Sequence, residues 1–322
     1  MYLIFKSSKV TRLVEVIAPN LLHRMVRKNI DRTQNPFGVE KSTLNTWWKG
    51  IEPDADGEWM FFTGFMYQLS PLIYSALRYL ERVERSNLAQ KAVFSEFVMN
   101  LSGFIMARGY SESLKRETDS ILSAIYRHLV SSGAEPYYLP ELDTYSGVML
   151  HDLGDDGGFE RHIISIAESF EENGIDKIVT CDPHTTYVMS ELLPEITGKK
   201  VTVKSYLDMV KAGNEEGIED MEIGVHDPCY YARHLGLEGK IARLLRKSGM
   251  GAFIPENSGK MTSCCGGPAE YISPIIAREM AKMRLEEFNG RIVCTACPVC
   301  LISFRRAGGK AVDVATTLRV IE

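Results

Sequence analysis

Apolar residues fall into two kinds of pattern along the 322 residues of this chain. In some segments they recur every three or four positions, which is typical of helices packed on a core, and elsewhere they form short continuous runs, which are typical of buried strands. Helices are predicted at 70–85, 113–131, 159–173, 185–194, 237–248, 272–288 and 299–306. Strands are predicted at 59–65, 136–141, 177–181, 199–205, 222–229, 252–256 and 291–297. Because helices and strands alternate, we expect an α/β fold with mostly parallel sheets flanked by helices.

Three segments lie outside this alternation. Residues 9–32 are predicted to form one amphipathic helix, or two short helices that meet at Pro19, and residues 33–58 are loop-like. Residues 91–106 carry an apolar stripe at helical spacing. Such a stripe usually packs on a core, and its alternative use is a membrane-surface or subunit-docking face.

The chain also contains a weak internal repeat, which predicts two related lobes. Residues 59–68 resemble 222–231, residues 144–154 resemble 262–272, and residues 177–187 resemble 291–301. In the second copy the repeat carries Cys229, Cys264-Cys265 and Cys297 with Cys300, and the corresponding residues of the first copy are Phe65, Tyr145-Ser146 and Cys181 with His184. The predicted regions are a helical and loop extension over 1–58, a first lobe over 59–205 and a second lobe over 206–322.

The composition is that of a globular protein, with 45% hydrophobic residues, 25% charged residues and a net charge of −5. It gives no indication of nucleic-acid binding, which needs a clustered basic face. Basic residues outnumber acidic ones near the beginning of the chain, at Lys6, Lys9, Arg12, Arg24, Arg27, Lys28 and Arg32. We interpret them as a solvated helix face, or as a docking surface for an acidic partner or an anionic membrane.

The sequence shows no signal-peptide pattern and no run of about eighteen apolar residues. We therefore expect the protein in the cytoplasm, or at the cytoplasmic face of a membrane through a partner. In a reducing compartment the seven cysteines are expected to be ligands or catalysts rather than disulfides.

Five cysteines of the second lobe form a regular pattern. Cys229 is followed at a distance by the adjacent pair Cys264-Cys265, and then by Cys297 and Cys300 in a Cys-Pro-Val-Cys run. Each group follows a predicted strand, and strand ends of a parallel sheet meet at one edge, so the thiols are expected to converge. Several converging thiolates suit an iron–sulfur cluster. Structural zinc uses four ligands and a thioredoxin-like dithiol uses two, so both explain this set less well.

Two features complete this constellation. Gly266 and Gly267 follow the cysteine pair, and they are expected to let the backbone approach a bulky inorganic core and to offer it N–H groups. Cys294 forms an overlapping Cys-x-x-Cys with Cys297, so it is an alternative ligand.

Residues 223–304, which contain HDPCYYARHLG, SCCGGPAE and ACPVC, resemble the cysteine-rich "CCG" domain of heterodisulfide reductase subunits B and D and of the iron–sulfur subunits of glycolate and lactate oxidases. The resemblance implies that the five patterned cysteines bind a [4Fe-4S] cluster. A set of five thiolates suits a noncubane cluster better than a cubane, which takes four. Three of the five expected thiols are absent from the first lobe, so no second cluster is predicted there.

Three further side chains are candidates for catalysis. His226 and Arg233 flank Cys229 and are suited to supplying protons or binding an acidic substrate, although their charges are equally explained as local structure. His184 is interpreted as a packed or hydrogen-bonded histidine, or as a proton donor that faces the cluster from the first lobe.

These features give three hypotheses for function. The first is a heterodisulfide-reductase-like oxidoreductase subunit that acts on a thiol or disulfide. The second is an electron-relay subunit of a flavin-dependent lactate or glycolate dehydrogenase, and the third is a structural zinc protein. The chain has no ferredoxin-type CxxCxxCxxxC run, so both redox hypotheses require other redox subunits, namely a ferredoxin-like iron–sulfur protein or a flavoprotein.

Overall fold

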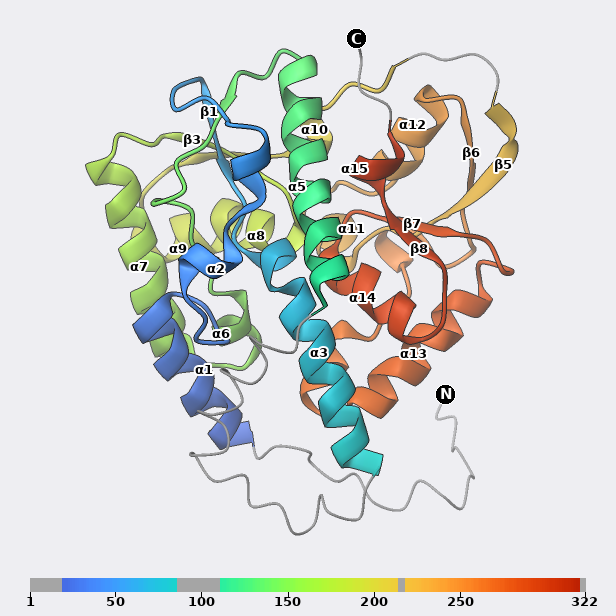
Figure 1. Ribbon diagram of the computed structural model, residues 1–322, viewed down its shortest axis with the longest axis horizontal. Helices are drawn as coiled ribbons and strands as arrows, with labels where there is room; N and C mark the ends of the chain where they lie inside the picture. The colour runs from blue at the N-terminus through green and yellow to red at the C-terminus, as the bar shows by residue number, and fades with distance from the viewer. Residues whose placement is uncertain (1–18, 86–110, 214–217, 319–322) are drawn as a thin grey trace.

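The computed structural model describes residues 19–85, 111–213 and 218–318, and it contains two parallel sheets of four strands each (Figure 1). The first sheet has the order β2 (Pro136–Tyr137), β1 (Trp59–Phe62), β3 (Lys177–Thr180) and β4 (Thr202–Ser205). The second has the order β6 (Met250–Phe253), β5 (Ile218–Val225), β7 (Val293–Thr295) and β8 (Ala311–Asp313). The two sheets share one strand order, which supports the internal repeat and confirms the predicted α/β class.

The helices of the first lobe begin with α3 (Met66–Arg85), one turn earlier than predicted. The others are α5 (Glu112–Ser131), α6 (Val148–Asp152), α7 (Asp156–Glu172), α8 (Pro183–Tyr187), the π-helical turn η3 (Val188–Leu192), α9 (Leu193–Thr197) and α10 (Tyr206–Met209). The predicted helix at 185–194 is therefore three consecutive pieces. Side-chain caps fix several starts: Ser111 accepts a hydrogen bond from the N–H of Leu114, and Asp155 accepts one from Gly158.

The helices of the second lobe are α11 (Cys229–Arg233), α12 (Lys240–Lys247), η4 (Gly259–Met261), η5 (Gly267–Tyr271), α13 (Pro274–Glu286), α14 (Pro298–Arg306) and α15 (Val314–Thr317). Strand β8 and helix α15 were not predicted, because each is only three or four residues long. Asp313 ends β8 and caps α15 by accepting the N–H of Ala315.

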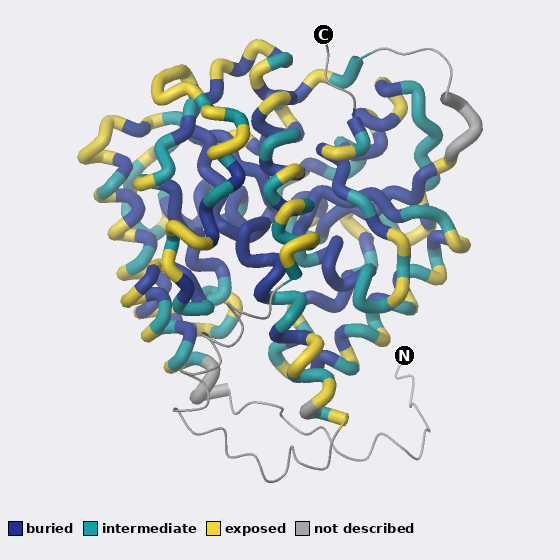
Figure 2. The backbone as a smooth tube through the Cα atoms, in the orientation of Figure 1, coloured by how far each residue is buried: buried dark blue, intermediate teal, exposed yellow. Residues whose placement is uncertain are grey.

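Helices α3 and α5 run between the two sheets and join the lobes (Figure 1). One core cluster contains Phe61 of β1, Leu129 of α5 and Val293 of β7, so it spans both halves of the molecule. Figure 2 shows the corresponding buried backbone at the centre. The two sheets thus pack as parts of one body, because the helices between them bury apolar side chains towards both lobes.

The N-terminal extension packs on the first lobe. Its helices are α1 (Pro19–Thr33), α2 (Lys41–Leu44) and η1 (Trp47–Gly50). Val26 of α1 is buried in the first-lobe core, and Arg27 forms an ion pair with Asp155. The predicted helical segments at 9–18 and 91–106, and the basic residues Lys6, Lys9 and Arg12, lie outside the described residues. None of the helices in the described ranges is both long and apolar enough to cross a membrane.

Candidate metal centre

The five patterned cysteines come together from three loops of the second lobe. Cys229 is the first residue of α11 and follows β5, whereas Cys297 and Cys300 lie at the start of α14 and follow β7. The pair Cys264-Cys265 precedes η5. Strands β5 and β7 are parallel neighbours, so their carboxyl ends meet at one edge of the sheet.

The thiols are close enough to change one another's pKa. The neighbouring thiols of Cys229 and Cys265 stabilise a Cys264 thiolate, as does the backbone N–H of Gly266 at 3.4 Å from its Sγ, and together they lower the pKa of Cys264. The same thiolate raises the pKa of Cys229 and of Cys265. All three thiols therefore interact within one group.

Cys297 and Cys300 extend this group on the side of α14. Burial opposes ionisation of Cys297, but the Cys300 thiol and the nearby His184 lower its pKa. Cys265 and Cys297 in turn raise the pKa of Cys300. The Sγ atoms of Cys265 and Cys300 and a ring nitrogen of His226 all lie within 4.8 Å of one another.

This balance of charge fits a cationic core. The protein alone favours thiolates at two of the five positions. It opposes them at the other three, where the thiol keeps its proton through a hydrogen bond to a neighbouring cysteine sulfur, through burial and through repulsion between like charges. Metal ions remove that opposition, because they bind the deprotonated thiol. The five-thiol donor set therefore fits an iron–sulfur cluster and exceeds the four ligands of structural zinc.

Gly266 and Gly267 are required by close packing around the cysteines. Gly266 has a φ of +90°, and a Cβ there would lie 2.4 Å from the carbonyl oxygen of Ala277 in α13. A Cβ on Gly267 would lie 2.5 Å from Val299 Cγ1 and 3.6 Å from Cys265 Sγ. The glycines therefore hold the cysteine loop against α13 and α14, a role that the sequence did not indicate.

Cys294 is not part of this group. It lies in β7, paired with Val225 and Val312, and it is fully buried. Burial and the charge of Asp313 raise its pKa. Cys181 is also buried, and its thiol donates to the carbonyl oxygen of Thr63 at 3.4 Å.

The first lobe has a related arrangement without the thiols. Asp182 precedes α8 as Cys297 precedes α14, and a proline follows each of them. This places Asp182 and Thr185, rather than Cys181 and His184, at the positions of Cys297 and Cys300. The side chain of Thr185 packs directly against Gly64, where an added Cβ would lie 2.0 Å from the threonine Oγ1.

His184 approaches the cysteines from the first lobe. Its ring centroid lies 4.9 Å from that of Tyr230, and its Nδ1 lies 3.4 Å from Asp182 Oδ1. Burial opposes protonation, but the Cys297 thiolate and Asp182 raise the pKa of the imidazole to about 9. His184 therefore lies beside the cysteine group, where the second of the two sequence interpretations requires it.

The other two catalytic candidates differ in position. His226 is 1% exposed and accepts a hydrogen bond at Nδ1 from Nε of Arg284 at 3.3 Å. Arg233 is exposed, and its guanidinium donates to the carbonyl oxygen of Thr262. This contact ties α11 to the segment before the cysteine pair, which supports a structural role for Arg233.

A cavity of about 580 Å³ leads to the cysteines. Its walls include Cys229, Cys265, Cys297 and Cys300, with His184 and Tyr230 beside them. Away from the cysteines the wall is mostly apolar. The N-terminal extension and α6 form part of it, and α3 contributes Met66, Leu69, Ile73, Ala76, Leu77 and Leu80. The sequence showed the helical stripe of α3, but which cavity that stripe borders depends on contacts between the lobes.

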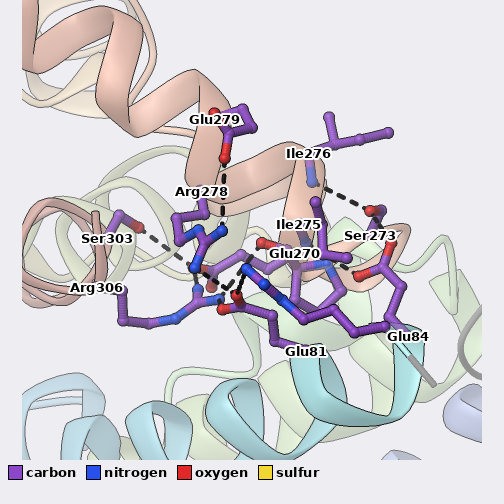
Figure 3. Close-up of polar contacts among 12 residues, drawn as sticks. Glu81, Glu84, Glu270, Ser273, Ile275, Ile276, Arg278, Glu279, Ser303 and Arg306 are labelled. Carbon is purple, nitrogen blue, oxygen red and sulfur yellow. Dashed lines mark hydrogen bonds and ion pairs between the residues drawn. The ribbon is translucent and has the colours of Figure 1, made fainter. Parts of the chain in front are cut away.

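A buried ionic network joins the lobes beside this cavity (Figure 3). The side chain of Arg306 in α14 is 2% exposed, and its guanidinium contacts Glu270 at 2.7 Å and Glu81 of α3 at 3.4 Å. Arg278 also contacts Glu81, at 2.6 Å. Glu270 lines the cavity, and burial raises the pKa of its carboxyl to about 7 despite the charge of Arg306.

Glu84 adds a further contact between the lobes. It accepts hydrogen bonds from the hydroxyl of Ser273 and, at 3.0 Å, from the N–H of Ile275, so it caps the start of α13. The second-lobe partners of Glu81 and Glu84 are about 190 or more positions away, and sequence pattern gave no signal for them.

Residues 223–305 match the family model of the cysteine-rich domain, CCG. This match lies within the second lobe and agrees with the family that the sequence resemblance implied. Among individual proteins, the chain is similar to the EtfAB:quinone oxidoreductase of Syntrophomonas wolfei, with 22% identity over 237 residues. That similarity covers 68% of this chain and 33% of the relative, so the chain spans about a third of the length of this curated relative. The domain and the relative support an iron–sulfur oxidoreductase-related subunit.

Proposed function

We propose that the protein is the iron–sulfur subunit of an oxidoreductase complex, and that a substrate enters the cavity and reaches the cluster directly. The observation that carries this proposal is the presence of four of the five ligand cysteines in the cavity wall. A subunit that only relays electrons needs no such opening, because electrons tunnel between buried centres. Substrate access therefore favours a heterodisulfide-reductase-like role in which the substrate is a disulfide or a thiol.

The residues around the cysteines are suited to this reaction. Reduction of a disulfide to two thiols requires two electrons and two protons, and the electrons would come through the cluster from a ferredoxin-like protein or a flavoprotein. The protonated imidazole of His184 lies beside Cys297 and is suited to giving a proton to a sulfur leaving group. The buried carboxyl of Glu270, at the cavity wall, is a second group suited to holding a proton.

The cluster itself would be held by Cys229, Cys264, Cys265, Cys297 and Cys300. When bound, it supplies one-electron redox chemistry that no side chain of the protein provides. The apolar wall, to which α3 contributes six residues, would hold the apolar body of the substrate.

A second candidate is electron exchange with a quinone, supported by the apolar wall of the cavity and by the name of the relative. In this case the chain would carry electrons between a flavoprotein and a quinone near a membrane. The lactate or glycolate dehydrogenase relay remains a version of this electron-carrying hypothesis with a different flavoprotein.

The test uses anaerobically purified protein. Iron and acid-labile sulfide should both be present, and zinc without sulfide would instead support the structural-zinc hypothesis. The EPR spectrum of the partly oxidised cluster should change when a thiol is added, if a sulfur substrate reaches it. A spectrum that responds to a quinone analogue and to none of the thiols would favour the second candidate.

Access through the cavity is tested by filling it. Ala76 is 8% exposed and lies in the cavity wall, so Ala76→Phe should block substrate entry. We expect turnover to fall at least tenfold while chemical reduction of the cluster is unchanged. The matched control is Arg82→Phe on the exposed side of the same helix, which should leave turnover intact. Equal turnover in both variants would show that the substrate does not use this cavity.

A further inference from the structure

Arg284 is buried next to the candidate cluster, where a charged side chain is costly. It belongs to α13 and is 1% exposed. Its Nη1 contacts Glu287 at 2.7 Å, its guanidinium lies over the ring of Phe288 at 4.7 Å, and its Nε donates to His226 Nδ1 at 3.3 Å. The contacts with Glu287 and Phe288 are explained by local packing within α13 and its end. The hydrogen bond to His226 instead connects Arg284 to a residue beside the cysteines.

The hydrogen bond from Arg284 determines where His226 carries its proton. A guanidinium can only donate, so the Nδ1 atom that accepts from it has no hydrogen. An imidazole with an unprotonated Nδ1 is neutral and carries its hydrogen on Nε2. Because Nε2 is then an N–H group, its lone pair is not available to a metal ion.

The ring of His226 lies close to two of the cysteine sulfurs. A ring nitrogen of His226 lies within 4.8 Å of the Sγ atoms of Cys265 and Cys300. Nε2 is buried and has no hydrogen-bond partner within the described ranges. The ring is held edge-on against Phe304, with centroids 4.8 Å apart. A buried donor without a partner is unfavourable, so a sulfur acceptor would satisfy it.

We propose that Arg284 fixes His226 as an N–H donor to the cluster sulfurs at Cys265 and Cys300, and that this pair raises the reduction potential of the cluster. The inference rests on the proposed cluster. A hydrogen bond to a ligand sulfur withdraws electron density from it, and the reduced cluster, which carries more negative charge, gains more from the bond. His226 is therefore a positioning and tuning residue rather than an additional metal ligand.

The variants His226→Leu and His226→Gln test this assignment. The first removes the donor, and the second keeps an N–H near the same place. In an EPR-monitored redox titration of the anaerobic protein, His226→Leu should lower the midpoint potential. If the ratio of reduced to oxidised cluster at a fixed potential falls tenfold, the midpoint potential of this one-electron couple has fallen by ~59 mV. His226→Gln should recover most of the difference.

Hyperfine spectroscopy gives a readout that does not depend on activity. After exchange into D₂O, wild type should show a coupling from an exchangeable deuteron near the cluster, and His226→Leu should lose that coupling. A strong nitrogen coupling in wild type would instead show that His226 binds iron, and it would overturn the proposal.

Arg284→Met separates tautomer control from charge. In the wild-type background this variant removes both the positive charge and the donor to Nδ1 of His226. In the His226→Leu background there is no imidazole, so the same substitution measures the effect of the charge alone. We expect Arg284→Met to shift the midpoint potential more in the wild-type background than in the His226→Leu background, because the imidazole tautomer can change only where His226 is present. Equal shifts would overturn the role given to Arg284.

Failure of this inference is distinguishable from failure of the proposed function. Absence of iron and sulfide in wild type would remove the cluster, and the proposed function with it. A cluster with an unchanged potential and an unchanged deuteron coupling in His226→Leu would overturn only the His226 assignment. Iron content measured in every variant separates loss of tuning from loss of the cluster.

Discussion

Tyr67 donates a 2.6 Å hydrogen bond from its phenolic oxygen to Asp313 Oδ2, and this bond links α3 of the first lobe to β8 of the second. Both side chains are almost completely buried. Asp313 also accepts the N–H of Ala315 at 2.9 Å, so one carboxylate serves the lobe contact and the cap of α15. The loss of either donor would leave a buried charge less well satisfied.

Replacement of Tyr67 by Phe should destabilise the protein by about 2 kcal/mol, because it removes the donor and leaves the buried carboxylate behind. The measurement is the thermal midpoint of anaerobic protein with its iron content verified. Tyr126→Phe is the control, since the Tyr126 hydroxyl donates to the neutral carbonyl oxygen of Pro136 within one lobe. If both variants lose the same stability, the bond to Asp313 stabilises the protein no more than an ordinary hydrogen bond to a neutral acceptor.

The carboxyl of Asp313 should make stability depend on pH. Burial raises its pKa to about 6, so the folded protein keeps this proton up to a higher pH than the unfolded chain does. The stability that this group contributes is complete below its unfolded pKa, and it is lost as the pH rises through about 6. Between pH values near 5 and 7.5, wild type should lose about 1.4 kcal/mol from this source.

Asp313→Asn tests this dependence, because an amide does not titrate in the same range. The thermal midpoint of Asp313→Asn relative to wild type should rise by a few degrees from near pH 5 to near pH 7.5. A constant difference between the two proteins would contradict the raised pKa. Other titrating groups are common to both proteins, so they cancel in this comparison.

Cys300 and Cys294 should behave differently when each is replaced by Ala. Cys300 lies in the converging group, whereas Cys294 lies in β7 with its neighbours Asp313 and Thr317. We expect Cys300→Ala to lose most of the bound iron and Cys294→Ala to keep it. Iron and sulfide per chain are the measurements. Loss of iron in Cys294→Ala with a normal content in Cys300→Ala would reverse the ligand assignment.

Removal of the charge of Arg306 should destabilise the contact between the lobes. Arg306→Met leaves the buried Glu270 and the nearly buried Glu81 without this partner. Because breaking a buried ion pair leaves an uncompensated charge, we expect a loss of about 3–5 kcal/mol in the free energy of unfolding. The control is Arg85→Met, because Arg85 is exposed and its pair with Glu81 is worth about 0.5 kcal/mol. Thermal midpoints that fall equally in both variants would argue against a buried network.

Much of the fold followed from local pattern. The strand at Lys177–Thr180 and the helix at Glu112–Ser131 lie within a residue or so of their predicted bounds, because each has a clear apolar period. Strand β8 was missed, because its three residues are too few for a period to develop. Helix α3 begins before its predicted start, because Met66 and Tyr67 continued the apolar run of the preceding strand.

The candidate site was predictable where its members share a motif. The cysteines follow strand ends, and topology alone predicts that strand ends converge. Arg284 had no such signal, because it lies near the site through a contact between elements distant in the chain. Glu270 closes the SCCGGPAE run, but its burial against Arg306 depends on the packing of α14. A charged residue in the last turn of a predicted helix, as Arg284 is, is exposed to solvent in most proteins, and only the packing of α13 shows that this one is buried.

Cys264 is half-buried and is absent from the cavity wall, although the other four predicted ligand cysteines form part of that wall. The cluster would therefore have two separate approaches, one for the substrate through the cavity and one for an electron donor at Cys264. Donor and substrate could then occupy the protein at the same moment. Steady-state kinetics with both varied should give intersecting rather than parallel double-reciprocal lines, the pattern of a ternary complex.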